Sequence, residues 1–158
     1  MKFVATIEAR MTSKRLPGKV LMKVLGKPML EYLVERLKQV DSLDEIVLAT
    51  TTNKEDDVLE EFAKSSNIKF YRGSEEDVLG RVIAAAESVN ADVIIEITGD
   101  CPLIDPQLVA QMVSIYKANQ ADYVSNAAIR SYPVGMDIQV FALEVLKKSA
   151  SQTNDSRD

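Results

Sequence analysis

The stretch KFVATIEARMTSKRLPGKVL, residues 2–21, decides the fold of this chain. Its first part, residues 2–9, is an apolar and β-branched run of the kind that forms a buried strand. A loop that contains Pro17 and Gly18 follows the strand. This loop belongs to the segment 10–27, which carries six cations and no acid. In parallel sheets, ligands bind beyond the carboxyl ends of the strands. We therefore expect this basic loop to lie at a ligand-binding edge.

The rest of the chain alternates strand-like and helix-like segments. Strands are expected at 45–51, 68–72, 92–100, 122–126 and 136–142, and helices at 28–40, 54–65, within 73–89, at 105–119 and at 143–150. Ser74 with Asp77 resembles a capping box that opens a helix, and Asp105 before Pro106 fits a helix N-cap. This alternation predicts an α/β fold, a Rossmann-like three-layer sandwich whose mainly parallel sheet is covered on both faces.

The length and composition are those of a soluble globular protein. The 158 residues suit one domain, expected over 1–150 with a polar tail at 151–158. No apolar run approaches the roughly 18 residues needed to span a bilayer, and the first residues do not resemble a signal peptide, so we expect no membrane partner. The single Cys101 excludes an internal disulfide and favours a cytoplasmic location. The absence of His removes Ser-His-Asp chemistry and the usual transition-metal sites.

The charges are unevenly distributed. The net charge is −5, although the 10–27 segment is purely basic. An acidic body argues against nucleic-acid binding, which needs a broad basic face. Positive charge gathered in one loop favours a small, dense anion as ligand, and the alternative is a solvated basic loop. The acidic run at 55–61 is interpreted as a solvated helix face.

The basic loop contains side chains suited to phosphate. Arg10 and Arg15 can each donate two hydrogen bonds to phosphate oxygens, and Lys19 can act as a point charge among several of them. Gly18 permits a close approach of the backbone to a ligand. The loop is not a P-loop, because LPGKV at 16–20 lacks the first Gly and the Ser or Thr after Lys.

Two aspartates are candidate metal ligands. Asp100 is the last residue of the segment 92–100, directly after its apolar run, at the same edge of the sheet as the basic loop. A carboxylate there can bind Mg²⁺, which prefers one or two protein carboxylates together with phosphate oxygens. The alternative is a turn residue that hydrogen-bonds the local backbone. Asp137, beside Gly135, can complete a metal site if the two loops converge, or can be a strand-edge residue.

A further segment offers weaker candidates. Arg72 and Ser74 combine a charged fork with a helix N-terminus, which suits an anion or a sugar. Arg81 is interpreted as a surface residue or as a partner for Asp77. Cys101 is disfavoured as a nucleophile because no His is present to activate it.

Taken in order, several motifs resemble one family. They are ARM-S-RLPGKVL, GKPMLEYLVERL, DEIVLATTTNKEDD, YRGSEEDVLGR, ITGDCPLIDP, ADYVSN and GMDIQVF, and they cover nearly all of the chain. They resemble the sugar cytidylyltransferases, which activate acylneuraminate and 3-deoxy-manno-octulosonate, and most closely the branch of the spore coat polysaccharide biosynthesis protein F. Agreement in order and spacing over this length is a strong signal, whereas each motif alone is weak.

The resemblance implies a nucleotide-diphospho-sugar transferase fold, GT-A-like. It also implies Mg²⁺-dependent transfer of a cytidylyl group from CTP to an acidic or otherwise specialised sugar, giving a CMP-sugar and pyrophosphate for surface polysaccharide biosynthesis. By position, it assigns triphosphate binding to Arg10, Ser13, Arg15 and Lys19, nucleotide or sugar contacts to Arg72 and Ser74, and metal binding to Asp100 and, more loosely, Asp137. Catalysis would then depend on Arg10, Lys19 and Asp100.

The sequence also departs from the pattern of this branch. Glu8 and Thr12 stand where Gln and Gly are expected, and Glu8 would bring a negative charge close to the phosphate loop. The chain stops at 154–158, where relatives continue into a segment that completes the catalytic domain and often the contact of a homodimer. Two alternatives therefore remain: a GT-A glycosyltransferase that uses a nucleotide sugar, and an inactive nucleotide-binding fragment.

Overall fold

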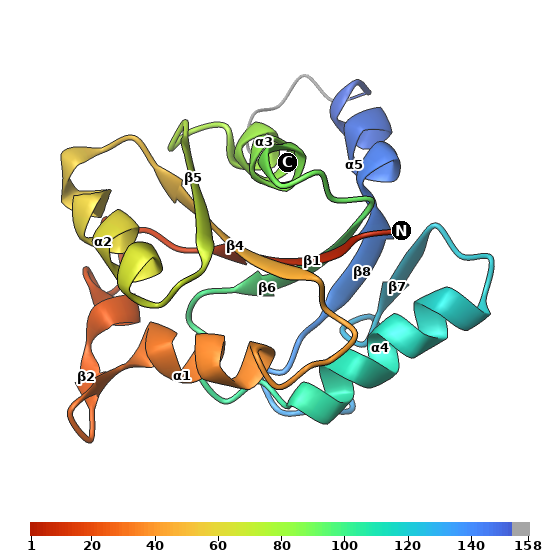
Figure 1. Cartoon of the computed structure of the whole chain (residues 1–158), viewed down its shortest axis with the longest axis horizontal. Helices are drawn as coiled ribbons and strands as arrows, with labels where there is room; N and C mark the ends of the chain where they lie inside the picture. Colours follow the sequence, from red (N-terminus) through yellow and green to blue (C-terminus); the bar gives the residue numbers. More distant parts are fainter. Residues whose placement is uncertain (153–158) are drawn as a thin grey trace.

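A six-stranded sheet forms the centre of the molecule (Figure 1), which is described over residues 1–152 by a computed structural model. The strands are β1 (Phe3–Glu8), β4 (Glu45–Thr51), β5 (Lys69–Gly73), β6 (Val93–Thr98), β7 (Tyr123–Ser125) and β8 (Gln139–Ala142), in the spatial order β5-β4-β1-β6-β8-β7. The first four of these strands are parallel, and β8 pairs antiparallel with both β6 and β7. The predicted, mainly parallel sheet is confirmed.

Helices cover both faces of the sheet (Figure 1). On one face lie α1 (Met29–Leu37), α2 (Asp57–Ser65) and α4 (Pro106–Ala118), whose apolar residues form a single buried cluster with that side of the strands. On the other face, α3 (Val78–Ser88) and α5 (Leu143–Ala150) enclose a second cluster. The three-layer arrangement predicted from the sequence is therefore confirmed.

Strand β1 shows why its sequence is apolar without alternation. Ala5 and Ile7 point into the cluster beneath α1 and α4, whereas Val4 points into the cluster beneath α3, and none of the three is exposed. A strand buried on both faces gives a continuous apolar run. The run ends at Glu8, where the chain leaves the core and enters the basic loop.

The start of α3 differs from the sequence prediction. The N-cap is Asp77, whose carboxylate accepts a hydrogen bond from the backbone N–H of Gly80 at 2.8 Å. The hydroxyl of Ser74 instead accepts hydrogen bonds from the backbone N–H groups of Glu76 and Asp77. The predicted capping box at Ser74 is therefore wrong, because Ser74 stabilises the turn that precedes the cap. The predicted N-cap at Asp105 is confirmed, since its carboxylate accepts from the backbone N–H of Gln107 at 2.8 Å.

A small hairpin interrupts the basic segment and was not predicted. Strands β2 (Lys23–Val24) and β3 (Lys27–Pro28) pair antiparallel across a two-residue turn. Leu25 and Gly26 in this turn have φ angles of 52° and 83°, the left-handed pair that suits a tight hairpin. The usual Asn-Gly or Asp-Gly signal is missing here, and Leu25 is 96% exposed at the tip.

The strand order creates a crevice at one edge of the sheet. The connection after β1 leads through α1 to β4 on one side, whereas the connection after β6 leads through α4 towards β7 and β8 on the other. Because β1 and β6 are neighbours, the loops that follow them diverge and leave room for a ligand between them. The 9–20 loop and the 98–101 loop therefore border the same crevice.

The last described element, α5, ends at Ala150. Most of the polar tail predicted at 151–158, from residue 153 onward, lies outside the described residues. Among the helices within 1–152, none is both long enough and apolar enough to cross a membrane.

Candidate active site

A cavity of about 360 Å³ lies at the crevice between β1 and β6. Its walls are the loop between Ala9 and Val20, the loop 98–100 after β6, and the first turn of α3 with Val78 and Arg81. Four side chains predicted to bind triphosphate share this cavity with the predicted metal ligand Asp100; these are Arg10, Ser13, Arg15 and Lys19. The topology therefore brings together residues that the sequence separates by about ninety positions.

Lys19 and Asp100 meet directly across the cavity. The Lys19 ammonium group, on the 3₁₀ helix η1 (Lys19–Leu21), donates a hydrogen bond to Asp100 Oδ2. Partial burial alone would raise the pKa of Asp100, but the hydrogen bond and charge of Lys19, with a hydrogen bond from Thr98, hold this pKa below its ordinary value. Asp100 is therefore a carboxylate at neutral pH, the form that can bind a metal ion.

The basic loop is closed by its own backbone. Gly18 has a φ of 71° and donates its N–H to the carbonyl oxygen of Met11 at 2.8 Å. Val20, only 2% exposed, anchors the end of the loop in the core. The left-handed conformation at Gly18 explains why a glycine follows Pro17. The closed loop holds its cationic side chains at the edge of the sheet.

A second glycine brings the β6 loop against the β1 loop. The backbone N–H of Gly99 donates to the carbonyl oxygen of Glu8 at 2.8 Å. A Cβ atom at Gly99 would lie 2.7 Å from that oxygen and 2.9 Å from Ala9 Cβ, both too close for unstrained packing. Gly99 therefore permits the close approach that places Asp100 beside the basic loop.

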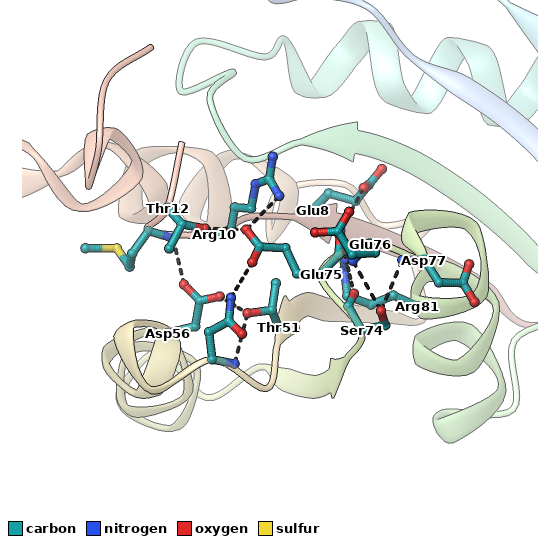
Figure 2. Close-up of polar contacts among 12 residues, drawn as sticks. Glu8, Arg10, Thr12, Thr51, Asp56, Ser74, Glu75, Glu76, Asp77 and Arg81 are labelled. Carbon is teal, nitrogen blue, oxygen red and sulfur yellow. Dashed lines mark hydrogen bonds and ion pairs between the residues drawn. The ribbon is translucent and has the colours of Figure 1, made fainter. Parts of the chain in front are cut away.

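Glu75, in the turn between β5 and α3, binds the basic loop through its carboxylate (Figure 2). Its carboxylate accepts hydrogen bonds from Arg10 Nη1 at 2.9 Å, from the Thr12 hydroxyl at 2.7 Å and from Asn53 Nδ2 at 2.6 Å. Thr12 and Asn53, followed by the charge of Arg10, hold the pKa of Glu75 below its ordinary value. Sequence analysis missed Glu75, because nothing distinguishes it from the neighbouring acids of GSEED. Thr12, which stands where Gly was expected, donates one of these hydrogen bonds to Glu75.

Asp56 also positions the basic loop. It is fully buried, and its carboxylate accepts hydrogen bonds from the backbone N–H of Met11 at 2.7 Å and from the Thr51 hydroxyl (Figure 2). The interpretation of 55–61 as a solvated helix face is therefore wrong for Asp56. Its carboxylate replaces water as the hydrogen-bond acceptor for a backbone group of the loop.

Arg72 and Ser74 do not line the cavity. The Arg72 guanidinium group forms ion pairs with Asp57 at 2.8 Å and Glu60 at 3.0 Å on α2, and its Nε donates to the carbonyl oxygen of Thr51. The carboxylate of Asp57, and to a smaller extent that of Glu60, raise the pKa of Arg72. The structure therefore uses Arg72 to join β5 to α2, and the predicted nucleotide or sugar contacts of Arg72 and Ser74 stay predictions.

Asp137 lies near the site but outside the cavity lining. Its carboxylate is 3.5 Å from the guanidinium group of Arg130. Burial raises the pKa of Cys101, and the charges of Asp100 and Asp137 act in the same direction, so both carboxylates lie within electrostatic reach of one thiol. Within residues 1–152, no group of three or more Asp, Glu or Cys side chains is arranged to hold a metal. A metal ion here would depend on one or two carboxylates and on substrate oxygens.

Arg81 is a site residue that the sequence interpretation missed. It is not a surface residue, because it is 6% exposed and lines the cavity, and its contact with Asp77 is the backbone hydrogen bond of the helix, from the Arg81 N–H to the Asp77 carbonyl oxygen at 3.1 Å. Its Nη1 donates to the carbonyl oxygen of Ser74, and its Nη2 lies 3.6 Å from Glu8 Oε2. Burial, and then the neighbouring Glu8 carboxyl group, raise the pKa of Glu96 to about 8. Three ionisable side chains that the sequence did not connect thus form one cluster at the cavity.

Comparison with known protein families gives a match over nearly the whole chain. A family model described as Cytidylyltransferase matches residues 4–155. An uncharacterized protein of Methanocaldococcus jannaschii is 41% identical over 94% of this chain and 60% of its own length. The spore coat polysaccharide biosynthesis protein SpsF of Bacillus subtilis is 40% identical over 74% of this chain and 50% of its length. A 3-deoxy-manno-octulosonate cytidylyltransferase of Geobacter metallireducens is 30% identical over 82% of this chain and 48% of its own length.

Solved structures agree with this assignment. A cytidylyltransferase from Leptospira borgpetersenii superposes with a TM-score of 0.94 at 37% identity, over 99% of this chain and 66% of that one. A CMP:2-keto-3-deoxy-manno-octonic acid synthetase complexed with CTP has a TM-score of 0.74 at 22% identity, which shows the shared fold. The chain spans about half to 60% of the length of the curated relatives described above. The family match, the relatives and the fold together show that this chain belongs to the cytidylyltransferase family.

Proposed function

We propose that the cavity binds CTP and transfers its cytidylyl group to a sugar hydroxyl, giving a CMP-sugar and pyrophosphate. The observation that carries this proposal is the convergence of Arg10, Ser13, Arg15 and Lys19 on one cavity, opposite Asp100. Family membership supports cytidine as the base. The names of two relatives, a spore coat polysaccharide protein and a 3-deoxy-manno-octulosonate enzyme, favour an acidic or specialised sugar destined for surface polysaccharide.

The cations suit the charge that develops in this reaction. A nucleoside triphosphate carries about four negative charges, and attack at its α-phosphorus moves further charge onto the non-bridging oxygens and the departing pyrophosphate. Arg10, Arg15 and Lys19 can stabilise this charge because the folded loop holds them in place before the substrate binds. Preorganised groups of this kind commonly contribute several kcal/mol each, on the order of 3.

Asp100 fits a Mg²⁺ ligand, since it is a partly buried carboxylate that is ionised at neutral pH. Asp137 is the candidate for a second ligand. When bound, Mg²⁺ supplies Lewis-acid neutralisation of phosphate oxygens. Lys19 bonds to Asp100 in the structure, so Lys19 would exchange this partner for phosphate oxygens when the nucleotide binds.

The acceptor hydroxyl requires placement more than a strong base. Its oxygen bonds to the α-phosphorus, the bond from that phosphorus to the bridging oxygen breaks, and pyrophosphate leaves with the bonding electrons. The hydroxyl proton passes to water. Because the sequence contains no His, in-line positioning and charge stabilisation would carry most of the rate enhancement.

Pyrophosphate release tests the proposal. The protein is incubated with CTP, Mg²⁺ and a panel of acidic sugars, and Lys19→Ala should abolish the release. Lys23→Ala is the matched control, because Lys23 is an exposed cation of the same segment and does not line the cavity. Release that is unchanged in Lys19→Ala would count against the proposal, and release of a nucleoside diphosphate from a sugar nucleotide would indicate a glycosyltransferase instead. Calorimetry with CTP separates nucleotide binding from turnover.

A further inference from the structure

Three ionisable side chains meet on the α3 side of the sheet, beside the cavity. Glu8 on β1 is paired in register with Thr98, and Glu96 on β6 is paired with Thr6, so the two glutamates come from adjacent parallel strands. Arg81 approaches Glu8 from α3. Most other buried residues on this side are apolar, and Thr6, which alternation along β1 places on the same face, is buried with no hydrogen-bond partner for its hydroxyl within the described residues. Charges are rarely retained in such surroundings without a partner or a ligand.

The guanidinium group of Arg81 is incompletely satisfied. Its side chain is 5% exposed, and within the described residues its Nε is buried without a hydrogen-bond partner. Its Nη2 is 3.6 Å from Glu8 Oε2, longer than a good charge-assisted hydrogen bond. Burial lowers the pKa of Arg81, and the charge of Glu8 opposes this effect. The cation is therefore desolvated and has only a loosely placed counter-ion.

Both members of this pair face the cavity. Arg81 and Glu8 line it together with Arg10, Arg15 and Lys19. Of the cations in that lining, Arg10 is already paired with Glu75 and Lys19 with Asp100. A polyphosphate that enters the cavity would bring its negative charge close to Arg81, and Glu8 would repel the same charge. In a partly dry cavity both effects are stronger than they are in water.

We propose that Arg81 is a further anion-binding residue of this cavity and that Glu8 is its internal counter-ion when no polyphosphate is bound. The inference rests on the proposed function, because the anion is the triphosphate of the nucleotide. Glu8 stabilises the desolvated guanidinium group in the free protein and opposes the incoming phosphate. Glu8 therefore sets the affinity for polyphosphate below the value that the cations alone would give.

Glu96 lies beside Glu8 and is not among the charged groups that act on Arg81. Burial is the larger cause of its raised pKa of about 8, so at pH 7 Glu96 is mainly protonated. The other charged groups that act on Arg81 are Arg10, Asp56 and Asp77. Replacing Glu8 by glutamine would therefore remove the nearest counter-charge at pH 7.

The test is calorimetric titration with inorganic tripolyphosphate at pH 7, using the full chain. Glu8→Gln should bind it about tenfold more tightly than the wild type, because one opposing carboxylate is removed from the cavity. The control is Glu76→Gln, which removes the same charge from an exposed position in the β5–α3 turn and should change the affinity less than about twofold. Arg81→Gln should bind about tenfold more weakly. Its thermal unfolding is recorded beside the titration, since Arg81 also holds the turn carbonyl of Ser74.

The Glu8→Gln result does not depend on the stability of Arg81→Gln. Unchanged or weaker binding of tripolyphosphate by Glu8→Gln would overturn the inference, and so would a gain of equal size in Glu76→Gln. If the wild type still released pyrophosphate from CTP, the proposed function would stand. A wild type that binds neither tripolyphosphate nor CTP would overturn both.

Discussion

Replacing Glu96 by glutamine should stabilise the folded protein at neutral and mildly alkaline pH. Glu96 lies on β6 next to β1, and burial followed by Glu8 raises its pKa from 4.5 to about 8. In the unfolded chain the same carboxyl group ionises near its ordinary value. Between about pH 4.5 and pH 8 the folded state therefore binds a proton that the unfolded state has lost, and the free energy of unfolding falls as the pH rises. Above this window the penalty is constant.

The size of the effect follows from the two pKa values. Each tenfold change in the ionisation constant corresponds to about 1.4 kcal/mol, so a pKa of 8 in place of 4.5 sets an upper limit of about 5 kcal/mol. The expected effect is smaller than this limit, because Glu96 is only partly buried and keeps some contact with water. We therefore expect that the stability advantage of Glu96→Gln over the wild type grows by about 2 kcal/mol between pH 5 and pH 8.

Urea denaturation followed by circular dichroism at pH 5, 6, 7 and 8 measures this difference. The comparison across pH removes any constant effect of exchanging a carboxyl group for an amide. Glu76→Gln serves as the control, because Glu76 is exposed and its curve should run parallel to that of the wild type. If the Glu96→Gln curve also ran parallel to the wild type across this range, Glu96 would ionise normally in the folded protein, and the reasoning about the cluster would be refuted.

Two further predictions concern the residues that position the basic loop. Gly99→Ala should lower the free energy of unfolding by about 2 kcal/mol and weaken CTP binding, because the new Cβ would lie 2.7 Å from the carbonyl oxygen of Glu8 and would separate the two loops; urea denaturation and calorimetry measure both effects. Asp56→Ala should cost about 3 kcal/mol, because it leaves the backbone N–H of Met11 and the Thr51 hydroxyl without their acceptor. The exposed Glu61→Ala on the same helix is its control in denaturation, and equal losses in the two variants would contradict a positioning role for Asp56.

Much of the fold could be predicted because its signals are local. The apolar run of β1 and the strand–helix alternation each depend on a few consecutive residues, and they fix a parallel sheet with helices on both faces. The hairpin of β2 and β3 was not predicted because Leu25 adopts a left-handed backbone conformation, which a leucine in the sequence does not indicate. The start of α3 was misplaced because Ser74 and Asp77 are both good caps, and only the folded turn decides between them.

The candidate site was only partly predictable. The basic loop and Asp100 could be assigned to one crevice, because the edge of a parallel sheet collects the loops after its strands. Glu75 and Asp56 could not be assigned to the site from the sequence, since each acts through a contact with a residue more than forty positions away. Arg72 was assigned to the site by position, yet its ion pairs with α2 depend on the packing of that helix beside β5.

Arg81 left a signal in the sequence that the interpretation did not use. The buried apolar residues of α3 include Val82, Ala85 and Ala86, which repeat with the helical period, and Arg81 falls on the same stripe. A cation at a core position of an amphipathic helix must find a counter-charge or a ligand, because its burial without one is costly. Glu8 supplies that counter-charge only at 3.6 Å. The helical pattern of α3, combined with the acid at the end of β1, therefore indicates that Arg81 belongs to the cavity and not to the surface.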